Sequence, residues 1–284
     1  MKQYLIDVCI REMTELSLGM NVPQKFSIRE YNKCFSSKSH LSQKLTTQPI
    51  SSVFQFNNMG LSTNCPLFLY IIKNPSNQRM LMELGILPTV ETKSMPLDRQ
   101  AFFFYSYFMR THVILSKSVQ MEVQRRGLFH HNRNSICMHV RCGVPLADFG
   151  DQSSFLSVKD ISSFYHCQRT FPFQDDSGAK PVVVIASDSS RAKNIIRNYN
   201  SNNAEVIWWE NRTTHTMTRY FRKTHSSVVE SAVIDLFSLS QCSHFVGTFR
   251  STFSLTAAAI MGKVPPLVKK GSKACEIPKV ITFG

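Results

Sequence analysis

The second half of the chain alternates short apolar runs with segments of helical spacing, and this alternation limits the possible folds more than any other feature. The clearest run, "PVVVIAS" at 181–187, is β-branched and apolar, which is typical of a strand buried on both faces of a parallel sheet. The predicted strands lie at 136–141, 181–187, 204–209, 243–248 and 264–268. The predicted helices lie at 157–167, 189–200, 225–242 and 251–262. Strands and helices in alternation indicate a doubly wound parallel α/β domain.

The first half gives weaker signals. Residues 1–65 are rich in Ser, Asn, Gln and Lys, and their periodicity is mixed. The segment "NPSNQRMLMELGIL" at 74–87 is a helix candidate, and residues 101–127 predict an aromatic segment, a turn and then a helix. Because 284 residues suit two domains, we predict an N-terminal domain at 1–134 and a C-terminal α/β domain at 135–284, with a cleft between them.

The formal net charge of +14 favours anionic partners such as nucleic acids, lipid headgroups or phosphate-bearing small molecules. The densest basic clusters, "QRRG" at 124–127 and "LVKKGSK" at 267–273, are short. No zinc-finger spacing, RNA-binding aromatic motif or basic zipper accompanies them. A basic nucleic-acid-binding protein stays an alternative, but we expect no nucleic-acid partner.

The chain has 8 cysteines and no CxxC pair, so we expect no metal site. An even number permits disulfides, but buried free thiols are the simpler interpretation. The sequence shows no secretory signal and no apolar run of transmembrane length. We therefore expect membrane association only if an anchor is missing from this chain.

Polar residues follow three of the predicted strands, and ligands of parallel α/β sheets bind at the carboxyl ends of strands. In "HVRCG", His139 and Arg141 are two residues apart and share one face of the strand. Arg141 then lies at the strand end, where its guanidinium can bind a phosphate. A structural arginine beside a core histidine is the alternative, and the pair alone does not decide between them.

The strand ends in "VGTFRSTFS" and "IASDSS" offer further polar groups. Thr248, Arg250, Ser251 and Thr252 lie between a strand and an Ala-rich helix, where free backbone N–H groups and hydroxyls form an anion site. A plain helix cap by Ser251 or Thr252 is the alternative. Asp188 either accepts hydrogen bonds from a ribose or base, or caps the next helix.

Asp235 lies in the otherwise apolar predicted helix at 225–242. It either needs a buried partner or faces solvent. Two phosphate-type sites and a carboxylate on successive strand ends indicate a nucleotide or nucleotide-sugar ligand. The absence of a P-loop, and of a GxGxxG motif after a strand, argues against a kinase-like ATPase and a standard dinucleotide enzyme.

These segments resemble the three motifs of the GDP-fucose-dependent fucosyltransferase superfamily, which holds the α-1,2-, α-1,6- and protein O-fucosyltransferases. "HVRCG" resembles its HxRxG signature, "VVVIASDSS" its second motif, and "VIDLFSLSQCSHFVGTFRSTFSLTAAAIMG" its third, in matching order and spacing. The resemblance covers the second half of the chain. It implies a GT-B fold, in which two Rossmann-like α/β domains face each other across a cleft. It also implies metal-independent, inverting transfer of L-fucose from GDP-fucose to a glycan or protein hydroxyl.

The resemblance also implies roles for single residues. Arg141 would hold the β-phosphate and neutralise the leaving GDP, with His139 and Gly143 in the same pocket. Asp188 and Asp235 would contact the guanosine. The diphosphate would be held by the third motif, through Ser251 and Thr252 with Thr248 beside them. The first half would then be the acceptor-side domain, whether complete or incomplete, and the compartment would be the Golgi or ER lumen.

The chain departs from the motif at one position, because many superfamily members have a second arginine where this chain has Cys142. Arg250 is a candidate to supply the missing charge. The catalytic base is open, and Asp148 and Asp151 in the loop after the first motif are the nearest carboxylates. A catalytically inactive glycan- or protein-binding module of the same fold is therefore the main alternative to a fucosyltransferase.

Overall fold

A computed structural model describes ten stretches of the chain, which are residues 47, 67–87, 95–111, 113–127, 134–143, 145–147, 155–171, 180–209, 226–278 and 281. The chain divides into two compact units: unit 1 is Met1–Ile114 with Val280–Gly284, and unit 2 is Leu115–Lys279. Within the described stretches, no helix combines the length and apolar character needed to span a bilayer.

Unit 1 contains three described helices, α4 (Leu67–Lys73), α5 (Pro75–Glu83) and α6 (Leu97–Thr111). Helix α5 begins as its sequence predicts, because Asn74 Oδ1 accepts a hydrogen bond from the Ser76 amide at 2.9 Å and a proline occupies the first helical position. The aromatic segment, predicted without a secondary structure, is helix α6. Phe104 and Phe108 are four residues apart on one face of α6, and both are buried.

Unit 2 is built around a six-stranded sheet of order β3-β2-β1-β4-β5-β6, counted over the described residues. The strands are β1 (Ser135–Val140), β2 (Val182–Ser187), β3 (Glu205–Ile207), β4 (His244–Thr248), β5 (Leu267–Val268) and β6 (Cys275–Glu276). All neighbouring pairs are parallel except β5 and β6, which are antiparallel. This confirms the predicted α/β class with a mainly parallel sheet, and sequence analysis missed only the short β6.

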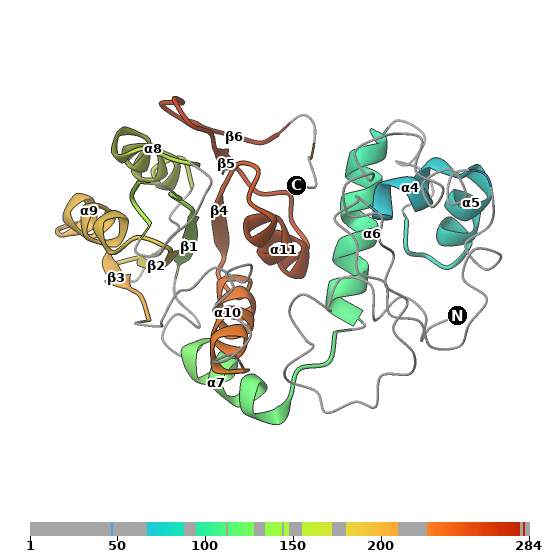
Figure 1. Cartoon of the computed structure of the whole chain (residues 1–284), viewed down its shortest axis with the longest axis horizontal. Helices are drawn as coiled ribbons and strands as arrows, with labels where there is room; N and C mark the ends of the chain where they lie inside the picture. The colour runs from blue at the N-terminus through green and yellow to red at the C-terminus, as the bar shows by residue number, and fades with distance from the viewer. Residues whose placement is uncertain are drawn as a thin grey trace. The chain divides into compact units, whose positions relative to one another are not determined.

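Helices cover both faces of this sheet (Figure 1). They are α7 (Lys117–Gly127), α8 (Val158–Gln168), α9 (Ser190–Asn200), α10 (Ser226–Leu239) and α11 (Thr252–Met261). Helices α8 and α9 pack together on one side, and α10 packs against α7 and α11 on the other. Because α7 packs on α10, unit 2 includes α7 and so begins before residue 135. The order reverses between β1 and β4, so the carboxyl ends of these strands form the switch point where ligands of such sheets bind.

The core of unit 2 explains why the β-branched runs form strands. Val183, Ile185 and Val246 are buried in the sheet and pack with Ile161 and Phe164 of α8. Burial of apolar area from both faces stabilises central strands by about 25 cal/mol per Å². Helix α11 ends at Gly262, which adopts a left-handed φ of 81°.

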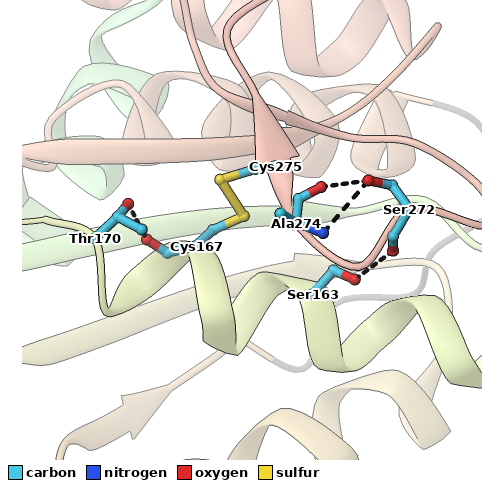
Figure 2. The surroundings of a disulfide bond; sticks show 6 residues. All are labelled: Ser163, Cys167, Thr170, Ser272, Ala274 and Cys275. Carbon is cyan, nitrogen blue, oxygen red and sulfur yellow. Dashed lines mark hydrogen bonds between the residues drawn. A yellow bond between two sulfur atoms is a disulfide. The ribbon is translucent and has the colours of Figure 1, made fainter.

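Four cysteines that we expected as free thiols form two disulfides, which corrects that expectation. Cys137 in β1 is bonded to Cys242 just before β4, and Cys167 in α8 to Cys275 in β6 (Figure 2). The sequence separations are 105 and 108 residues, so the pairing depends on the packing of the sheet and not on local spacing. Cys142 is buried.

Candidate functional site

One threonine ties the carboxyl end of β1 to that of β4. The Thr248 hydroxyl donates to the His139 carbonyl oxygen at 2.9 Å and accepts from the Arg141 amide at 2.9 Å. Thr248 is buried, so these bonds are shielded from water. The backbone of Arg141 is therefore fixed at the position where the predicted phosphate ligand would be met.

Asp188, which follows β2, organises the loop after β1. Its carboxylate accepts hydrogen bonds from the amides of Cys142 and Gly143 at 2.8 and 2.9 Å. Gly143 has a φ of 64°, a left-handed conformation that glycine adopts without strain. Asp188 does not cap α9, because Ser189 does so by accepting from the Ala192 amide. Its contact with guanosine stays a prediction.

The Arg141 side chain lies between two groups at this edge. Its Nη1 atom is 3.4 Å from Asp188 Oδ2, and its guanidinium carbon is 5.5 Å from the centroid of the Phe155 ring. The side chain is 18% exposed, whereas that of Asp188 is 3% exposed. The guanidinium is thus oriented by a buried carboxylate and an aromatic ring, yet it keeps a surface that reaches solvent.

His139 lies beneath this arginine as a neutral, buried ring. Its Nδ1 is 2.7 Å from Ser254 Oγ, and its ring stacks on Phe253 at 4.6 Å between centroids. Burial, and secondly the positive charge of Arg141, lower the pKa of His139 to about 3. His139 is therefore uncharged at neutral pH. It joins β1 to α11 through a hydrogen bond and adds no positive charge to the site.

The turn from β4 to α11 presents the remaining predicted residues. The Ser251 amide donates to the Thr248 carbonyl at 3.2 Å, and Arg250 between them has a φ of 65°. This positive φ suits the third position of a type II turn and costs a non-glycine residue about 1 kcal/mol. Arg250 and Thr252 are exposed. The structure brings both to the carboxyl edge of the sheet.

Ser251 is the N-cap of α11, as one of the two predicted alternatives had it. Its hydroxyl accepts from the Ser254 amide at 3.4 Å. The amides of Thr252 and Phe253 have no hydrogen-bond acceptor among the residues that the structure describes. Capping and anion binding are therefore compatible here, since the cap leaves two first-turn N–H groups unused.

Asp235 has a protein partner, and its contact with guanosine stays a prediction. Asp235 lies in α10 and forms an ion pair with Arg126 of α7, with 2.5 Å between Oδ1 and Nη1. Arg126 also contacts Glu122 at 2.9 Å. The carboxylate thus has the partner that its apolar helix required. Asp148 and Asp151, the candidate bases, lie outside the described residues.

Sequence analysis missed two residues that shape the site. Ser254 accepts from the Thr248 amide at 2.9 Å as well as contacting His139. Its place three residues after the cap was the available signal. Gly247 allows this approach, because a Cβ there would lie 2.7 Å from Ser254 Cβ. A glycine inside a strand often marks such a close approach.

No group of three or more His, Cys, Asp or Glu side chains in the described stretches is arranged to hold a metal ion. Around Arg141, the described part of the edge offers a guanidinium, hydroxyls and backbone N–H groups. These groups suit an anionic ligand with several oxygen atoms.

Comparison with known proteins identifies the fold of the chain. No protein-family model and no curated protein matches the chain. Among solved structures, an arginine-to-lysine mutant of Arabidopsis thaliana FUT1 in complex with GDP superposes with a TM-score of 0.51 at 14% identity, covering 84% of this chain and 51% of that one. POFUT1 in complex with GDP-fucose gives 0.40 at 12% identity over 86% and 69% of the two chains. NodZ α-1,6-fucosyltransferase soaked with GDP-fucose gives 0.38 at 13% over 57% and 47%.

The chain therefore has a fucosyltransferase-like α/β fold, as the three sequence motifs predicted. It spans about half the length of the FUT1 structure that it matches, with 51% covered. The arrangement of two domains facing across a cleft stays a prediction.

Proposed function

We propose that the chain is a glycosyltransferase that transfers L-fucose from GDP-fucose to a hydroxyl of a glycan or protein, with inversion at the anomeric carbon. The observation that supports this most is the position of Arg141, fixed by Thr248 and Asp188 at the end of β1. The turn into α11 follows the neighbouring strand at the same edge. The fold agrees, since the FUT1 structure with a similar fold holds GDP.

The proposed reaction needs positive charge where the leaving group departs. When the bond between the anomeric carbon and the phosphate oxygen breaks, its electrons stay on GDP, which gains negative charge. The Arg141 guanidinium and the unused amides of Thr252 and Phe253 are preorganised to stabilise that charge. Removing one such donor costs about 10²–10³-fold in rate in known enzymes. With these groups on the diphosphate, the proposed mechanism uses no metal ion.

The acceptor hydroxyl attacks the anomeric carbon from the face opposite GDP and gives its proton to a base. Asp148 and Asp151 follow the end of β1 in sequence and remain our candidates for that base. For the compartment we propose the Golgi or ER lumen. The two disulfides support an oxidising compartment, since such bonds are rare in the cytosol.

The first test is a calorimetric titration of the purified chain with GDP, and with GMP and ADP as controls. Selective binding of GDP is expected. A folded protein that binds no GDP would refute the proposal. GDP binding without transfer to any acceptor in a glycan and glycoprotein screen would instead favour the inactive binding module.

The second test changes the arginine. Arg141→Ala is expected to lower fucose transfer by about 10²–10³-fold, because the leaving group loses its main cation. Arg197→Ala is the matched control, since Arg197 is exposed in the last turn of α9, whereas the carboxyl end of β2 leads into the first turn. Transfer by Arg141→Ala at the wild-type rate would show that the role given to Arg141 is wrong.

A further inference from the structure

The basic cluster at 267–273, "LVKKGSK", takes no part in the site described above. It forms the end of β5 and the loop that leads into β6. We infer that Lys269, together with Arg250, forms a second cationic arm that binds the diphosphate of the nucleotide sugar. This inference rests on the proposed function and adds a residue that the fucosyltransferase motifs do not contain.

Lys269 leaves the sheet beside the turn that carries Arg250. Thr248 and Val268 are register partners in the parallel pair of β4 and β5. The Phe249 amide donates to the Val268 carbonyl at 2.9 Å, which extends the pairing by one step. Lys269 Nζ lies 5.9 Å from the centroid of the Phe249 ring. The ammonium therefore lies near the ring of Phe249, the residue between Thr248 and Arg250 in the turn.

The charges at this point are not compensated by the described part of the protein. Lys269 and Arg250 are both exposed, and neither has a carboxylate within 4.0 Å among the described residues. By contrast, Arg126 is paired with two carboxylates. Two uncompensated cations that follow neighbouring strands attract an anion with more than one charge. A diphosphate has this chemistry, and Arg141 alone does not balance it.

Helix α8 holds the β5–β6 loop at two points and the start of β6 at a third, so Lys269 is presented from a fixed element. Asp160 Oδ1 accepts from the Gly271 amide at 2.7 Å, and the Ser163 hydroxyl donates to the Ser272 carbonyl at 2.7 Å. The Cys167–Cys275 disulfide is the third attachment. Figure 2 shows the serine contact and the disulfide side by side. Positions 160, 163 and 167 share one helical face, so one side of α8 carries all three.

The test compares Lys269→Gln with Lys273→Gln in the full chain by calorimetric titration with GDP and GMP. Lys273 is an exposed lysine of the same loop, placed just before β6, and it controls for general surface charge. We expect Lys269→Gln to weaken GDP binding about tenfold and GMP binding by less than about threefold, since GMP lacks the second phosphate. Lys273→Gln is expected to bind GDP as the wild type does. Lys269→Arg keeps the charge and is expected to keep GDP affinity within about threefold.

The outcomes separate this inference from the proposed function. If wild-type protein binds no GDP, the proposed function itself fails. If wild type binds GDP and Lys269→Gln changes the affinity by less than about threefold, only the role of Lys269 is overturned. An equal loss in Lys273→Gln, or in GMP and GDP binding alike, would also overturn it, because the effect would then be general surface charge or a loss of structure.

Discussion

Two arginine–carboxylate pairs in unit 2 involve residues of similar chemistry but differ in their packing. Arg126 and Asp235 join α7 and α10 at 2.5 Å, and Arg126 is 5% exposed. Arg126 also lies 4.5 Å from the centroid of the Trp209 ring, with Glu122 as a second carboxylate. Its charge is enclosed and compensated.

Arg141 and Asp188 form the looser pair. Their atoms are 3.4 Å apart, Arg141 is 18% exposed, and Asp188 is held mainly by backbone amides. An enclosed pair holds helices together, whereas an oriented but partly exposed guanidinium can meet a ligand. The comparison predicts that the first pair contributes to stability and the second to activity.

The largest expected effect separates the two pairs by stability. Arg126→Ala leaves the Asp235 and Glu122 carboxylates without their partly buried cation, and we expect it to lower the free energy of unfolding by about 3–5 kcal/mol. Arg141→Ala leaves Asp188 with its two backbone donors, so we expect a loss of about 1 kcal/mol or less. Urea unfolding of both variants, followed by circular dichroism, measures the difference. Equal losses would mean that both pairs are structural.

A second prediction concerns two glycines, one inside β4 and one at the end of α7. A Cβ on Gly247 would lie 2.7 Å from Ser254 Cβ and 2.9 Å from Leu267 Cδ2, so α11 would have to move away from β4. We expect Gly247→Ala to cost about 3 kcal/mol and to weaken GDP binding, because the Ser254 contacts with His139 and Thr248 would be disturbed.

Gly127, at the end of α7, is the matched control. A Cβ there would meet only the tip of the Gln241 side chain, with its Oε1 at 2.1 Å, and that flexible amide can turn away. Gly127→Ala is expected to change stability by less than about 1 kcal/mol and to leave GDP binding unchanged. Thermal melts and GDP titrations of both variants test this. A larger loss of stability in Gly127→Ala than in Gly247→Ala would show that Gly127, and not Gly247, lies in the tighter contact.

Sequence analysis located the carboxyl edge of the sheet but not the contacts that hold this edge together. The alternation of strands and helices placed Arg141, Thr248 and Ser251 at carboxyl ends of a parallel sheet, and the structure confirms that sheet. These residues could be predicted from the sequence because strand period and capping are local signals. The end of α11 at Gly262 could be predicted for the same reason.

The contacts that hold the edge together are long-range, and local patterns do not encode them. Asp188 accepts from the amides of residues 45 and 46 positions away. Asp235 pairs with an arginine 109 positions away, and the two disulfides span 105 and 108 residues. A carboxylate in sequence shows only that a partner is needed. The tertiary fold decides whether that partner is a ligand, a backbone amide or an arginine.

The last prediction uses pH to test the environment of Arg141. Burial, and then the charge of Arg141, lower the pKa of His139 to about 3, whereas the ordinary value is 6.5. The unfolded chain therefore binds this proton more readily than the folded one. The contribution of the neutral His139 to the free energy of unfolding is fully present above pH 6.5. It falls as the pH drops toward 3, by about 2 kcal/mol between pH 8 and pH 5.

His139→Gln removes this group, so the variant should lose less stability than the wild type over the same interval. The pKa of His244 is also lowered, by burial and then by Lys263, and acts in the same direction. The difference between the two proteins, and not the wild-type slope alone, therefore isolates His139. In Arg141→Ala the pH dependence over this interval should stay close to that of the wild type, since burial, the larger cause of the lowered pKa, remains. Identical pH dependence in the wild type and His139→Gln would mean that His139 is not a neutral, buried ring in the folded protein.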